Sequence, residues 1–178
     1  STMLSGSQWT VYSSASWALT SNTLRHDTWT SADAAGFPIL PLLLRADEAS
    51  SGTISHALRF TIDSTSKSYV WPARHEAGST SSTDTPPMGQ LFRLKASYQI
   101  PANFNTQAKA ILQAMKTYGM YVADNGSNWY VQGEPSASWQ DETFSQVQSV
   151  AGSNFEAVDI TSITARSGFD PNSGAVPP

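Results

Sequence analysis

Apolar and polar residues alternate along several short stretches of the chain, which is typical of β-strands that bury one face. The clearest stretches are 54–62, 69–75 and 90–98. Between 105 and 118 the period changes, and apolar residues recur every three or four positions as they do in a helix. Asn105 or Thr106 is the expected N-cap, and Gly119 is the expected C-cap. The pattern therefore predicts several strands and one helix over 105–118.

Two of the alternating stretches are joined by turn-forming residues at 63–68, which predicts a β-hairpin. Only one register places every apolar side chain of the hairpin on the same face. In that register Phe60 opposes Trp71 on the buried face. His56 opposes His75, which would bring their Cβ atoms to about 4.5–5.5 Å.

The pair Asn125-Gly126 favours tight turns, so a second hairpin is expected between 120–124 and 128–132. Farther along, the sequence predicts a short helix over 141–150 and a strand over 155–160.

Short strands in hairpin series with a single helix predict an all-β fold, an antiparallel sandwich or jelly roll with one short α-helix on its flank at about 105–118. We expect one β-sandwich domain over residues 1–166. The remaining residues, 167–178, are rich in Pro and Gly and predict a disordered tail.

Composition narrows the possible partners. Charged residues make up 13% of the 178 residues, about half the share in an average soluble domain, and Ser and Thr fill the loops instead. This composition favours a secreted protein. A net charge of −4 with only 10 Lys and Arg argues against nucleic acid and anionic membranes as partners. The absence of cysteine excludes disulfides and thiolate metal sites.

The two histidines of the first hairpin are the most specific candidates for chemistry. Opposed on one face, His56 and His75 could share a divalent metal, with Asp47, Glu48 or Glu76 as a third ligand. One of them could instead act as a general base. The alternative is that both rings cap the polar end of the strand pair and bind backbone groups.

Carboxylates widen the set of catalytic candidates, since glycoside cleavage uses two that face one another. The carboxylates considered are Asp47, Glu48, Asp124, Glu134 and Asp159. Asp47 and Glu48 are adjacent, so in a strand at most one of them can serve a given cleft. The catalytic candidates are therefore His56, His75, Asp47 and Glu48.

Aromatic residues and one arginine are the candidates for substrate binding. The chain has 6 Trp and 6 Tyr, and exposed aromatic rings of β-sandwich proteins stack on sugars. Trp29 and Trp139 lie in weakly patterned segments where exposure is expected, whereas Trp71 and Trp129 fall on presumed core faces. Arg74 lies beside His75 and could hold a substrate there.

Several motifs resemble a family of largely uncharacterised secreted β-sandwich proteins of soil bacteria and fungi. They extend over about residues 15–160 and read WTSADAAG (29–36), HALRF (56–60), YVWPARH (69–75), PPMG (86–89) with RLKAS (93–97), and YGMYVADNG (118–126) with Trp129-Tyr130. The resemblance implies secretion and a sandwich fold, without an established activity.

Members of that family are longer and carry an upstream strand with an Asp-Arg-His motif. The resemblance therefore implies that this chain is the larger, C-terminal part of a processed precursor, with an N-terminal fragment of the same precursor as a partner.

Three functions are compatible with these features. The first is a secreted glycan-directed enzyme, a polysaccharide hydrolase or lyase. The second is a non-catalytic carbohydrate-binding or cell-wall module. The third is a metal-dependent enzyme that uses the two-histidine site.

Overall fold

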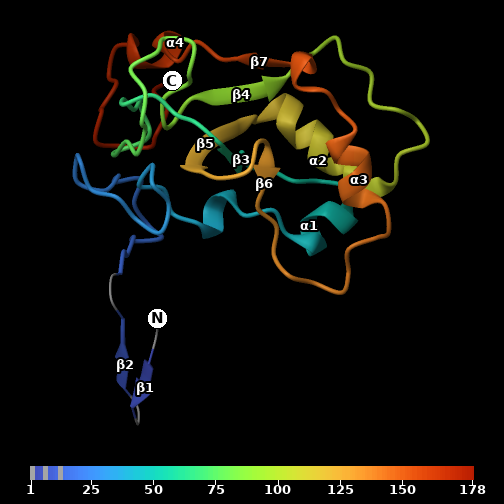
Figure 1. Ribbon diagram of the computed structural model, residues 1–178, viewed down its shortest axis with the longest axis horizontal. Helices are drawn as coiled ribbons and strands as arrows, with labels where there is room; N and C mark the ends of the chain where they lie inside the picture. Colours follow the sequence, from blue (N-terminus) through green and yellow to red (C-terminus); the bar gives the residue numbers. More distant parts are fainter. Residues whose placement is uncertain (1–2, 6–7, 12–13) are drawn as a thin grey trace.

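The centre of the molecule is an open mixed sheet of five strands in the order β6-β3-β5-β4-β7 (Figure 1). The computed structural model describes residues 3–5, 8–11 and 14–178. The strands of the sheet are β3 (Leu58–Ile62), β4 (Leu91–Leu94), β5 (Met120–Asn125), β6 (Tyr130–Val131) and β7 (Phe155–Ala157). The helices are α1 (Ala46–Ser51), α2 (Thr106–Thr117), α3 (Thr143–Gln148) and α4 (Thr161–Thr164), with 3₁₀ turns η1 (Leu40–Leu42) and η2 (Gly152–Asn154).

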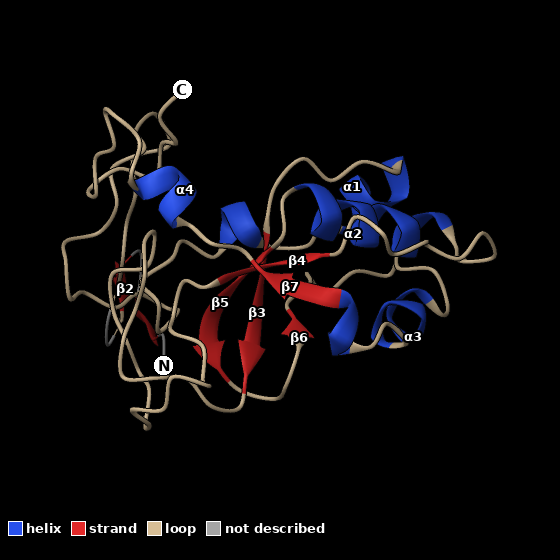
Figure 2. Cartoon of the chain, turned by 90° about the horizontal axis from the view of Figure 1, so that it is seen from above, coloured by secondary structure: helices blue, strands red, loops and turns tan. Residues whose placement is uncertain are grey.

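The prediction of an all-β sandwich or jelly roll is wrong, because the fold is a mixed α/β fold with one open sheet. Figure 2 shows α1, α2 and α3 gathered on one side of this sheet, with α4 and the long loops on the other. The apolar faces of the strands pack against helices and loops, whereas a sandwich would pack them against a second sheet.

Strand pairing differs from both predicted hairpins. β3 pairs in parallel with β5, and Phe60 stands beside Val122. The other edge of β3 pairs with β6, so β3 lies between the two strands of the expected second hairpin. Residues 69–75 form no strand, and Tyr69 makes only an isolated bridge to Met88. Phe60 therefore does not oppose Trp71.

The predicted long helix is confirmed as α2. The side chain of Asn105 accepts a hydrogen bond from the backbone N–H of Ala108 at 2.8 Å, which caps the first turn. Gly119 follows the helix with a φ of 76°, in the left-handed region that glycine adopts without strain. The short helix expected over 141–150 is present as α3.

The buried core lies between α2 and the sheet. Its largest fully buried apolar side chains come from β3, β4, β5 and α2 and from the segments that precede α1 and β4: Phe60, Leu44, Leu58, Met88, Leu94, Ile111, Leu112, Met115, Met120 and Val122.

The loop over 31–37 lies against the sheet on the face opposite Phe60. Strand alternation points Arg59 to that face, where it reaches Asp33 in the loop. The backbone N–H of Ala35 donates to Ala123 of β5 at 3.0 Å, and the ring of Phe37 packs 5.6 Å from that of Tyr121.

Both ends of the described chain lie outside the five-stranded sheet. Strands β1 (Met3–Ser5) and β2 (Gln8–Thr10) pair with each other and project from the rest of the molecule in Figure 1. The segment 167–178, for which disorder is expected, contacts the loops beside the sheet: Ser173 accepts from Trp71 Nε1 at 2.9 Å, and Pro171 accepts from Arg74.

None of the helices in the described part of the chain combines the length and the apolar character needed to cross a membrane.

Candidate functional site

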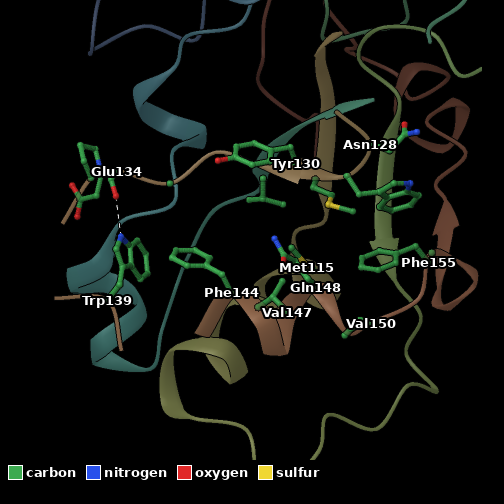
Figure 3. A pocket seen from close by; sticks show the side chains of 16 residues that line it. Met115, Asn128, Tyr130, Glu134, Trp139, Phe144, Val147, Gln148, Val150 and Phe155 are labelled. Carbon is green, nitrogen blue, oxygen red and sulfur yellow. Dashed lines mark hydrogen bonds between the residues drawn. The ribbon is translucent and has the colours of Figure 1, made fainter. Parts of the chain in front are cut away.

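An aromatic groove of about 710 Å³ runs between β6 and α3 (Figure 3). We define it by its main rings, Trp129, Tyr130, Trp139, Phe144 and Phe155. A volume of this size is within the range of sites that hold small ligands. The groove is therefore the first place to look for function.

One end of the groove is built on Trp129. Its φ of 57° is unusual for a residue with a side chain, and the turn that precedes it is held to the sheet by its neighbours. The backbone N–H of Trp129 donates to Thr61 O at 3.0 Å, and Asn128 Oδ1 accepts from the N–H of Asp63 at 2.9 Å. This turn fixes the indole at the mouth of the groove.

The indole of Trp129 lies within a cluster of three phenylalanines. Its ring centre is 5.3 Å from that of Phe60, 5.7 Å from Phe92 and 5.0 Å from Phe155. Such tilted and edge-on contacts stabilise aromatic clusters. Trp129 was expected to be a packing residue, and it packs on one side while keeping 37% of its surface exposed.

The other end is built on Trp139, which lies across the groove from Phe155 in Figure 3. Trp139 Nε1 donates to the backbone oxygen of Glu134 at 2.9 Å, and its ring meets that of Phe144 edge-on at 4.9 Å. The sequence singled out Trp139 as a substrate-binding residue, and its position in the groove is compatible with that role.

The groove has a buried apolar floor and a few polar groups. Met115 from α2 and Met120 from β5 are almost fully buried beneath it. Asn128, Glu134 and Gln148 also line it, and Glu134 is the only carboxylate among the described lining residues. One oxygen of Glu134 accepts from the N–H of Ala46 at the start of α1, at 2.8 Å.

The four predicted catalytic residues lie apart from this lining and do not form one cluster. His56 Nε2 lies 3.0 Å from Glu48 Oε2, so these two are brought together. His75 instead bonds through Nδ1 to the backbone oxygen of Ala34 at 3.0 Å. Asp47 is in helix α1 rather than in a strand, with 79% of its side chain exposed.

The contacts of His56 leave neither ring nitrogen free. Nδ1 lies 2.8 Å from the backbone oxygen of Ala57, and Nε2 faces Glu48. Glu48 also accepts a hydrogen bond from Arg45. A histidine that acts as a general base needs one nitrogen open to the substrate, so the arrangement supports a local structural role for His56. In the described part of the chain, no three side chains among His, Asp and Glu are grouped so that they could hold a metal ion.

The two other predicted binding residues differ in exposure. Arg74 is 7% exposed, and its guanidinium donates to the backbone oxygens of Arg25 and Pro171 and to Asn172 Oδ1. Trp29 is 56% exposed and lies outside the groove, with His26 tilted against its ring at 5.4 Å.

A buried ion pair that sequence reasoning missed lies on the other face of the sheet. Arg59 Nε donates to Asp33 Oδ2 at 2.9 Å, Nη2 donates to Asp33 Oδ1, and Nη1 donates to Gln132. Burial raises the pKa of Asp33 to about 6, while the hydrogen bond and the charge of Arg59 oppose that rise. Both oxygens of Asp33 bind Arg59, so the pair serves to hold the loop over 31–37.

In comparisons with protein-family models, with curated proteins and with solved structures, this chain has no match.

Proposed function

We propose that this protein is a secreted glycan-binding protein and that the aromatic groove is its binding site. The observation that carries the proposal is the exposure of three rings along one groove: Tyr130 is 61% exposed, Phe144 40% and Trp129 37%. Exposed aromatic residues scattered singly need no explanation, whereas several in one hollow are typical of a binding site. Flat rings offer an apolar surface to the C–H faces of sugars, and Tyr130 adds a hydroxyl.

The polar groups of the groove favour a glycan without charge. Asn128 and Gln148 can each donate and accept hydrogen bonds, which suits sugar hydroxyls. Glu134 is the single acid and no Lys, Arg or His is among the described lining residues, so the groove provides no cation for an acidic sugar.

Binding without cleavage is better supported than hydrolysis. Glycoside hydrolysis generally uses two carboxyl groups on either side of the scissile bond. Glu134 is one candidate, but Asp47 and Glu48 are not among the groove's described lining residues. The low content of charged residues, 13%, supports the extracellular location that we propose.

The test is calorimetric titration with neutral hexasaccharides: cello-, xylo-, manno- and laminarihexaose. We expect one of them to bind, and Tyr130→Ala and Phe144→Ala to weaken that binding three- to tenfold each, since one aromatic contact contributes about 0.5–1.5 kcal/mol. Tyr118→Ala is the matched control, because Tyr118 is 42% exposed and does not line the groove. It should bind as the wild type does.

Two results would count against the proposal: no binding by the wild type, or equal losses in the Tyr118 and Tyr130 variants. Product analysis after long incubation separates binding from catalysis. If the bound hexaose is shortened and Glu134→Gln stops the cleavage without weakening binding, the protein is an enzyme at this groove.

A further inference from the structure

Arg25 lies between two tryptophan rings on a different part of the surface. Its guanidinium carbon is 5.6 Å from the centre of the Trp17 ring and 5.4 Å from that of Trp29. Such contacts attract a cation to the faces of the rings and limit how the planar group can turn. We name Trp17, Arg25 and Trp29 the Arg25 clamp.

The guanidinium of Arg25 has no hydrogen-bond acceptor among the described residues. Its Nε is buried without a partner, whereas Arg59 and Arg74 each use three guanidinium nitrogens. An unsatisfied buried N–H is costly, so it calls for a specific explanation. Nε is closed to solvent, whereas Nη1 and Nη2 are not among the buried atoms without a partner. A carboxylate would therefore bind with its two oxygens to Nη1 and Nη2.

No acidic side chain among the described residues forms an ion pair with the guanidinium of Arg25. Asp27 is the nearest acid in sequence, and it is already engaged: it accepts from the hydroxyl of Tyr69 at 3.0 Å and lies 3.4 Å from Arg74 Nη2. His26 also lies beside the clamp, with its ring 5.4 Å from that of Trp29. The surroundings of Arg25 therefore favour an anion, in a chain whose net charge is −4.

A second groove, of about 730 Å³, adjoins the clamp through Trp17, whereas Arg25 and Trp29 lie outside its described lining. Trp17 lines it together with Leu19, Ile39 and Leu40. Hydroxyl groups are also part of its lining, from Ser14, Ser16, Ser21, Thr23 and Ser31. A ligand held at Arg25 could thus extend over apolar rings and hydroxyls, which is the mixture that a sugar chain requires.

We propose that the Arg25 clamp and this second groove bind an acidic oligosaccharide, with the carboxylate of a uronic acid on Arg25 and a sugar ring on exposed Trp29. The site is separate from the aromatic groove, and it does not rest on the neutral glycan proposed there. Its specificity comes from the planar, charged guanidinium of Arg25. The described residues that line the aromatic groove include no such group.

Trigalacturonate is the probe, titrated at low ionic strength and followed by calorimetry and tryptophan fluorescence. We expect Arg25→Gln to weaken binding at least tenfold, Arg25→Lys to weaken it less, and Trp29→Ala to weaken it several-fold. Lys67→Gln removes one positive charge from an exposed side chain that makes no hydrogen bond with the described residues, and it should bind as the wild type does.

The thermal midpoint of each variant shows whether it is folded. If Arg25→Gln does not fold, Arg25→Lys provides the test in its place. The proposal is overturned if trigalacturonate does not bind, if its methyl ester binds equally well, or if acetate at the same carboxylate concentration displaces it. It is also overturned if the Lys67 variant loses as much affinity as the Arg25 variants. Neutral hexasaccharides should bind all four variants equally, which separates this site from the aromatic groove.

Discussion

Arg59 donates to both carboxylate oxygens of Asp33, and the two side chains are 6% and 1% exposed. The pair connects the middle of β3 to the loop over 31–37, which covers that face of the sheet. A buried charge requires a partner with good geometry, and here each member supplies it for the other. The position of the loop consequently depends on the charge states of the two residues.

The raised pKa of Asp33 predicts a dependence of stability on pH. Its pKa is about 6 in the folded chain against an ordinary value of 3.8, chiefly because of burial. The folded state therefore holds this proton more tightly than the unfolded state does. The resulting stability is fully present below pH 3.8 and is lost as the pH rises through 6.

Two pH units correspond to about 3 kcal/mol. We expect the free energy of unfolding of the wild type, measured in urea relative to Asp33→Asn, to fall by about that amount between pH 4 and pH 7. A difference that stays constant over this range would show that Asp33 is not the titrating group.

Removal of the arginine should destabilise the fold most at neutral pH. In Arg59→Met the carboxylate of Asp33 would be buried without its cation, which costs about 3–5 kcal/mol when a buried pair is broken. At pH 4 the loss should be smaller, because Asp33 is then neutral. Arg93→Met is the matched control, since Arg93 and its partner Glu156 are 52% and 37% exposed and such pairs contribute about 1 kcal/mol or less. Equal losses in both variants would contradict this account.

Phe60 provides a test of the core. It is fully buried, and it contacts Phe92 and Trp129. Phe60→Ala should lower the free energy of unfolding by about 3–5 kcal/mol and change the near-ultraviolet circular dichroism of the tryptophan. Leu19→Ala, at a residue that is 93% exposed, should change stability by less than about 0.5 kcal/mol. A loss below 1 kcal/mol for Phe60→Ala would mean that this face is not packed in solution.

Periodicity predicted the positions of the elements better than their partners. The helix at α2 and the strand at β4 follow from local spacing, and both exist. The parallel pairing of β3 with β5 joins residues about 60 positions apart, and an alternating pattern does not say which other strand lies beside it. The fold class failed for that reason: hairpins were inferred from turns, although the strands pair across a long crossover.

The candidate site was predictable only in part. Trp139 was identified because aromatic residues in weakly patterned segments are often exposed, although it is half-buried and packs against the core. Asp33 was missed because it lies in a polar loop, and the sequence pattern of that loop does not predict a contact with Arg59. The available signal was an arginine in the middle of an apolar strand, which on a covered sheet face needs a buried acid.

Substitution of the two histidines can show whether glycan binds at the aromatic groove or at the histidine site that the sequence predicted. Both ring nitrogens of His56 face protein oxygens, and His75 is held to Ala34. Neither histidine lines the groove. We therefore expect the double variant His56→Gln, His75→Gln to bind neutral hexasaccharides with unchanged affinity, while its thermal midpoint falls by a few degrees because three hydrogen bonds are altered.

Titration of the double variant beside the wild type and Tyr130→Ala checks this expectation. If the histidine variant stays folded and loses glycan binding while Tyr130→Ala keeps it, the binding site lies near the histidines, and the aromatic groove has another role. If the histidine variant binds normally and Tyr130→Ala does not, the rings of the groove carry the interaction. The comparison is decisive because the two changes affect different parts of the fold: His56 bonds to α1 and His75 to the loop over 31–37, whereas Tyr130 belongs to β6 at the groove.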